Sequence, residues 1–153
     1  SIQVLVSKDR EGLPEPLSEE ELSAFSAYMR AIKTAGVVLS VRSLPADRLS
    51  IKARVQLDPI VYLPGGVRIR DGARPVEEAI RAYLRGITYG GGFNKTRLVD
   101  AIQAVEGVVD VELGECSAEP YKGLRRIIEG NNYSARSGCF IAPELSSTLT
   151  YSY

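Results

Sequence analysis

Residues 49–57 read LSIKARVQL and alternate an apolar with a polar side chain at every step. This period of two predicts a β-strand with one buried and one exposed face, because successive side chains of a strand point to opposite sides. A strand of this kind is typical of an antiparallel or mixed sheet that helices cover on one side. We therefore expect helices on one side of residues 49–57 and water on the other.

Two amphipathic helices are predicted after this strand. Pro75 is suited to the first turn of a helix, and the apolar stripe that follows it ends near Gly86. Asn94 is suited to cap a second helix, whose apolar stripe ends before Gly107. Shorter strand patterns follow at residues 109–113, 139–142 and 148–153.

A glycine-rich turn interrupts the segment between the strand and the first of these helices. Pro64-Gly65-Gly66 separates two short β-like runs, which predicts a β-hairpin excursion over residues 60–71. An excursion of this kind often forms an interaction surface, so we take it as a hypothetical protein contact. Its candidate contact residues are Tyr62, Leu63, Val67 and Ile69.

The residues before the long strand predict a small β-α-β unit. Ile2, Val4 and Val6 alternate as in a strand, and a second β-like run begins at Val37. Between them Ser18 and Glu21 have the spacing of a capping box, which predicts a helix. Its expected apolar stripe consists of Leu22, Phe25, Met29 and Ile32, and Gly36 is placed to end it.

Together these elements predict an α+β fold with two small modules. Residues 1–45 form the β-α-β module, which we expect to be the end of a domain that begins earlier. Residues 46–153 form a larger module with a mixed or antiparallel sheet packed on two helices. We expect a hinge between the modules at Pro45-Ala46-Asp47.

Composition narrows the classes of function. The chain has 153 residues, nineteen basic and nineteen acidic side chains, no histidine and two cysteines. These counts exclude histidine-based catalysis and a four-ligand zinc site, and the two cysteines are expected to be reduced. Zero net charge gives no long-range attraction to nucleic acid, and no apolar run approaches the roughly 20 residues of a membrane span. We expect neither nucleic acid nor a membrane as the main partner.

Two patterns are candidates for catalytic or anion-binding sites. Asp110 and Glu112 point the same way on a predicted strand, where paired carboxylates hold divalent metals in nucleotidyl-transfer enzymes. No phosphate-binding loop precedes them, so we favour the interpretation that they line the solvent face of the strand. Gly90-Gly91-Gly92 lacks the spacing of a nucleotide-binding loop and is interpreted as a flexible connection.

A basic and aromatic cluster near residue 125 is the second hypothetical protein contact. Tyr121, Arg125 and Arg126 are its candidate residues. Single-stranded nucleic acid is bound by such clusters, and an RNA-binding module is a weaker alternative. A polar protein interface needs no further assumption and is favoured here.

Several segments, in one order, resemble the C-terminal part of the baseplate J-like family, the wedge proteins of contractile phage tails and related injection machines. The resemblance covers about residues 15 to 113. The segments that carry it are LSEEEL at 17–22, TAGVVLSV at 34–41, the strand 49–57 followed by Asp58-Pro59, PVEEAIRAYL at 75–84 and LVDAIQAVEGVVDV at 98–111.

The resemblance implies a structural subunit, or a fragment of one, that is not an enzyme and uses no cofactor. Its partners would be further copies of itself and other wedge subunits around the central tube of a phage or prophage tail. Its location would be the tail baseplate of the virion, and the bacterial cytoplasm during assembly. The alternative is a metal-dependent nucleotidyltransferase-like enzyme that uses Asp110 and Glu112.

Overall fold

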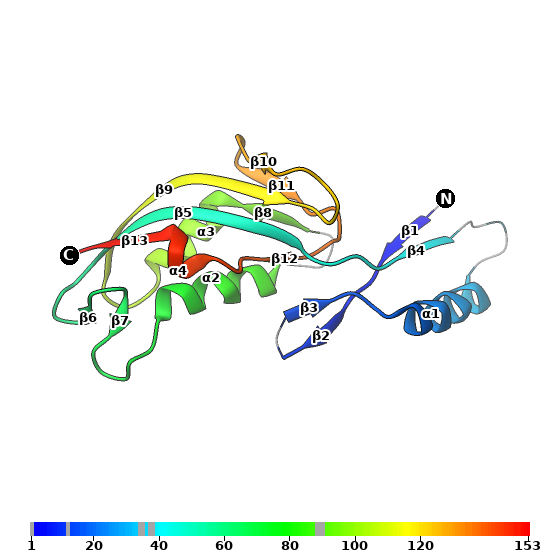
Figure 1. The fold of residues 1–153 in the computed structure, drawn as a ribbon, viewed down its shortest axis with the longest axis horizontal. Coiled ribbons are helices and arrows are strands. Elements are labelled where there is room, and N and C mark those ends of the chain that lie inside the picture. The colour runs from blue at the N-terminus through cyan, green and yellow to red at the C-terminus, as the bar shows by residue number, and fades with distance from the viewer. Residues whose placement is uncertain (1, 12, 34–35, 37–38, 88–90) are drawn as a thin grey trace.

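The computed structural model describes residues 2–11, 13–33, 36, 39–87 and 91–153. Its first elements form a small unit at one end of the molecule, and a larger sheet with its helices forms the other end (Figure 1). The first unit contains β1 (Ile2–Leu5), β2 (Lys8–Arg10), β3 (Leu13–Glu15), α1 (Glu19–Ile32) and β4 (Leu39–Arg42). Strands β1 and β4 pair in parallel, and β2 and β3 form an antiparallel hairpin.

Helix α1 begins at the predicted capping box. The Glu21 backbone N–H donates to Ser18 Oγ, and the Ser18 N–H donates to the Glu21 carboxylate, each at 3.2 Å. Lys8 on β2 reaches the same carboxylate with an Nζ to Oε1 distance of 2.6 Å, which ties the hairpin to the helix. The helix ends at Ile32, before the predicted stop at Gly36, because Lys33 takes an extended conformation. Of the strand predicted from Val37, residues 37 and 38 lie outside the described residues.

The larger unit is built on two long antiparallel strands, β5 (Asp47–Leu57) and β9 (Val108–Glu119). The short strand β10 (Arg126–Ile127) extends the sheet beyond β9. On the other edge of β5, β12 (Phe140–Ile141) and β13 (Leu149–Ser152) pair with it in parallel. Helices α2 (Pro75–Gly86) and α3 (Lys95–Gln103) pack on one face (Figure 1). The prediction of an α+β fold is confirmed.

Smaller elements connect these parts. The remaining elements are β6 (Tyr62–Leu63), β7 (Val67–Arg68), β8 (Gly92–Asn94), β11 (Asn132–Ser134) and α4 (Leu145–Thr148). Strands β6 and β7 form the predicted hairpin, and β8 pairs with β11. Asn94 caps α3 as predicted, since its side chain accepts the Arg97 N–H at 2.9 Å.

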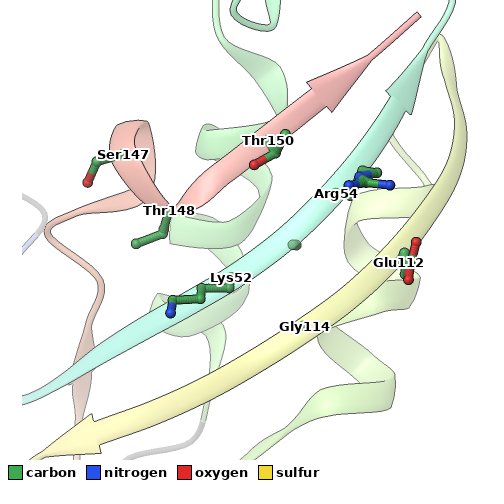
Figure 2. A pocket seen from close by; sticks show the side chains of 8 residues that line it. Lys52, Arg54, Glu112, Gly114, Ser147, Thr148 and Thr150 are labelled. Carbon is green, nitrogen blue, oxygen red and sulfur yellow. The ribbon is translucent and has the colours of Figure 1, made fainter.

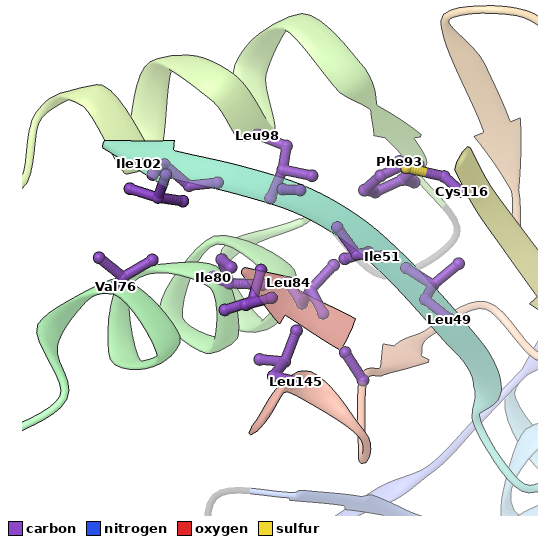
Figure 3. Packing of buried hydrophobic residues seen from close by; sticks show 14 of the residues in the cluster. Leu49, Ile51, Val76, Ile80, Leu84, Phe93, Leu98, Ile102, Cys116 and Leu145 are labelled. Atoms are coloured by element: carbon purple, nitrogen blue, oxygen red, sulfur yellow. The ribbon is translucent and has the colours of Figure 1, made fainter. Parts of the chain in front are cut away.

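The hydrophobic core lies between the sheet and α2 and α3. The inward side chains of β5 are almost completely buried, and those of both helices meet them (Figure 3). Each such aliphatic side chain contributes roughly 1.5–3 kcal/mol by leaving water. The largest fully buried apolar residues are Tyr62, Phe93, Ile51, Leu57, Ile80, Leu98, Ile102, Leu145, Val55 and Val76.

Strand β9 is longer than the alternation at 109–113 predicted. Its register against β5 shifts between the pairs Ile51–Cys116 and Ala53–Leu113, so β9 carries one extra residue there. The bulge lets Cys116 and Ala118 point into the core, although simple alternation does not extend to them. A second shift near the start of β9 leaves Val109 62% exposed, where alternation predicted an inward side chain.

The last two residues of the predicted hinge at 45–47 are buried. Ala46 is 7% exposed and Asp47 is fully buried. The Asp47 carboxylate accepts hydrogen bonds from Tyr133 Oη and the Arg136 N–H, and from both the N–H and the hydroxyl of Ser137, at 2.8–3.1 Å. These bonds fix the start of β5 to the loop before β12, because a buried carboxylate without such partners would be costly.

Candidate functional site

The β6–β7 hairpin carries the exposed apolar side chains that a protein contact requires. Leu63 and Ile69 are each 50% exposed, and Ile60, just before the hairpin, is 83% exposed. Ile60 and Ile69 also line one shallow depression together with Arg70 and Glu106. Exposed aliphatic side chains that gather in this way differ from the scattered ones normal on any surface. Ile60 is the first residue of the predicted excursion and was not among the predicted contact residues.

Tyr62 corrects the predicted contact list, because its ring is not available to a partner. It is 2% exposed, and its hydroxyl donates a hydrogen bond to the Glu106 carbonyl. Tyr62 and Leu63 are consecutive on β6 and therefore point to opposite sides, one into the core and one outward. Burial raises the pKa of Tyr62. Tyr62 thus anchors the hairpin. Val67, another predicted contact residue, is only partly exposed.

Charged side chains surround the hairpin. Arg68 binds Asp71 through two hydrogen bonds, Nε to Oδ1 at 3.0 Å and Nη2 to Oδ2 at 2.6 Å. With the Ala73 N–H, this contact lowers the pKa of Asp71 to about 2. Arg70 approaches Glu106 at 3.9 Å, and both side chains are well exposed, so this pair contributes little. The hairpin is therefore an apolar surface with a polar rim, as in many protein interfaces.

The second predicted contact lies elsewhere on the molecule. Tyr121 and Arg125 are exposed in the segment that leads into β10, and Arg126, the first residue of β10, is exposed as well. Leu124 in the same turn is 84% exposed and was not singled out from the sequence. Strand β10 pairs with the end of β9, whereas the hairpin contacts Glu106 before the beginning of β9 (Figure 1). The structure does not bring the two predicted surfaces together.

Asp110 and Glu112 lie on the face of the sheet that the helices leave open. Both are exposed, which confirms the prediction of a solvent-facing pair. Figure 2 shows Glu112 beside Arg54, its partner in the register, at a shallow depression that also includes Lys52 and Thr150. The Asp110 side chain makes a local hydrogen bond, in which its Oδ1 accepts the backbone N–H of Val111. Within the described ranges no group of three or more His, Cys, Asp or Glu residues is placed to hold a metal ion.

The glycine run and the cysteines provide no further site. Residues 88–90 lie outside the described residues, and Gly92 begins β8 directly before α3. Cys116 is buried in the core and Cys139 is half-buried, and both are free thiols. Burial raises the pKa of both thiols, which disfavours the reactive thiolate.

No protein-family model matches the chain, and no curated protein matches it. Among the helices of the described residues, none has the length and apolar character needed to cross a bilayer.

Proposed function

We propose that this chain is a structural subunit, or part of one, of a contractile-tail baseplate wedge, and that it assembles through protein-protein contacts. The order of sequence segments that resembles the baseplate J-like family supports this proposal, and their elements occur in an α+β fold. In this proposal, apolar side chains on rigid elements bind other subunits, and no reaction is catalysed.

The observation that carries the proposal is the exposed apolar surface of the β6–β7 hairpin. We define the hairpin surface as Ile60, Leu63 and Ile69, which are 50–83% exposed. It projects at the end of the molecule opposite the first unit (Figure 1). A surface at this extreme of the molecule is accessible to a neighbouring subunit in a ring.

An enzyme that uses Asp110 and Glu112 has less support. Both carboxylates are exposed on an open sheet face, and Glu112 lies beside the basic side chains Lys52 and Arg54. The described residues show no third carboxylate or cysteine grouped with this pair. A magnesium-dependent calorimetric signal with a nucleotide, abolished by Asp110→Asn, would favour the enzyme over the structural subunit.

Co-assembly with the proteins encoded beside this chain tests the proposal. We expect the chain to co-purify with them and to form ring or wedge particles in negative-stain electron microscopy. The triple variant Ile60→Ser, Leu63→Ser, Ile69→Ser is expected to weaken the complex at least tenfold, since the few central residues that carry most of the binding energy of an interface each contribute more than about 1 kcal/mol.

A matched control lies on α1. Tyr28 and Ile32 are 61% and 58% exposed, so Tyr28→Ser, Ile32→Ser removes a comparable apolar area far from the hairpin. We expect this double variant to assemble with the affinity of the unmodified chain through the hairpin. Equal loss in both variants, or assembly unchanged by the triple variant, would reject the hairpin as the contact.

A further inference from the structure

The β6–β7 hairpin is too short to hold its own conformation. Its ladder consists of two residue pairs, Tyr62 with Arg68 and Leu63 with Val67. Even longer isolated hairpins are marginally stable in water. Contacts from outside the hairpin must therefore order the turn that separates its strands.

Tyr153, directly after strand β13, contacts both sides of this turn. Its hydroxyl donates a hydrogen bond to the Leu63 carbonyl at 2.6 Å and accepts one from the Gly66 N–H at 3.2 Å. One side chain thereby binds one backbone group on each side of the turn. Arg74 adds a third bond, from its Nη1 to the Gly65 carbonyl at 3.2 Å.

Tyr151, on β13 itself, packs against the same turn at Gly66. Its ring lies so close to Gly66 that an added Cβ there would be 2.5 Å from Cζ of the ring. Strand β13 is in turn fixed to the centre of the sheet, because Tyr151 is the register partner of Val55 on β5. The hairpin turn is thus connected through β13 to the most buried strand of the molecule.

We infer that Tyr151 and Tyr153 are positioning residues for the hairpin surface: strand β13 holds the turn so that Leu63 and its neighbours face outward in a fixed arrangement. This inference rests on the proposed function for its biological meaning. A pre-ordered surface loses less conformational entropy when a partner binds, so the positioning acts on affinity without contact to the partner.

Hydrogen exchange on the full chain tests the positioning without any partner. Tyr153→Phe removes both hydroxyl bonds and keeps the ring, and we expect exchange across residues 61–69 to become about tenfold faster. Exchange in β5 and β9 should not change, whereas general destabilisation would accelerate it too. Tyr121→Phe is the control, because Tyr121 has the same 46% exposure as Tyr153.

Two glycine variants provide a second, independent test. Gly65 and Gly66 both have positive φ, +82° and +72°, so alanine is strained at either position. Only Gly66 has Tyr151 behind it, whereas an added Cβ at Gly65 meets nothing within 4 Å. We expect Gly66→Ala to accelerate hairpin exchange several-fold more than Gly65→Ala.

The outcomes separate this inference from the proposed function. Unchanged hairpin exchange in Tyr153→Phe, or equal effects of the two glycine variants, would overturn the positioning role, whatever the chain binds. Faster hairpin exchange supports the positioning role even where partner affinity stays the same, a result that would instead count against the hairpin as the contact surface.

Discussion

The two units of this chain use the same local signals but bury very different amounts of surface. In the first unit no described side chain between residues 3 and 45 is buried, and the apolar stripe of α1 is at best half-covered. In the second, α2 and α3 bury Val76, Ile80, Leu84, Leu98 and Ile102 against β5. A two-stranded sheet is too narrow to cover a helix, whereas a five-stranded sheet covers two. Most of the free energy that stabilises the folded chain should therefore come from its second unit.

Two phenylalanines give the largest expected contrast. Phe93 is fully buried, with ring centroids 6.2 Å from those of Tyr83 and Phe140, while Phe25 on α1 is half-buried. We expect Phe93→Ala to lower the free energy of unfolding by about 3–5 kcal/mol. Phe25→Ala should cost well under half of that. Denaturant unfolding followed by circular dichroism measures both, and equal losses would reject the contrast.

The Asp47 network gives the next largest effect. Asp47→Ala removes the acceptor of the hydrogen bonds from Tyr133, Arg136 and Ser137, so we expect a loss of about 3 kcal/mol. Asp110→Ala is the control, because its carboxylate is exposed and should change stability by less than about 0.5 kcal/mol. An Asp47→Ala variant as stable as the unmodified chain would mean that the start of β5 is held less tightly than its hydrogen bonds indicate.

The N-caps of α1 and α3 allow the two units to be compared with the same kind of substitution. Ser18→Ala and Asn94→Ala each remove a side-chain acceptor at a helix N-terminus, a loss of about 1 kcal/mol. Because α1 has no buried residue, we expect Ser18→Ala to accelerate hydrogen exchange in α1 alone. Asn94→Ala should instead lower the global unfolding midpoint. Global destabilisation by Ser18→Ala would show that the first unit is coupled tightly to the second.

Acid titration gives the smallest effect. The hydrogen bond from Lys8, with those from Ser18, lowers the pKa of Glu21 from its ordinary 4.5 to about 2. Because the folded pKa is the lower one, the contact stabilises the first unit fully above pH about 4.5 and is lost as pH falls towards 2. Side-chain NMR titration should place Glu21 near pH 2, and Lys8→Met should raise its pKa. An unchanged pKa in Lys8→Met would contradict the contact.

Local chemistry explains which parts of the fold could be predicted. Four predicted features depend only on neighbouring residues, and the structure contains all of them. They are the capping box at Ser18, the Asn94 cap, the 49–57 alternation and the Pro64-Gly65-Gly66 turn. Periodicity tells which face of α1 is apolar and not whether another element covers it. For that reason the sequence could not show that Phe25 stays half-buried.

The errors have a common cause in long-range geometry. The bulge near Gly114 and the burial of Asp47 depend on partners far away in sequence, such as Ile51 and Ser137. At the hairpin, both Tyr62 and Leu63 were predicted as contact residues, because the local pattern does not say which of two consecutive strand residues points inward. The role of Tyr153 depends on a contact between residues 63 and 153, which no local pattern reveals.

Hydrogen exchange of the chain, alone and mixed with the proteins encoded beside it, shows whether the hairpin surface binds them. We expect amides at residues 60–69 to become protected in the complex, while the open sheet face around Lys52 and Glu112 exchanges as before. Protection confined to that open face, with unchanged exchange in the hairpin, would contradict it.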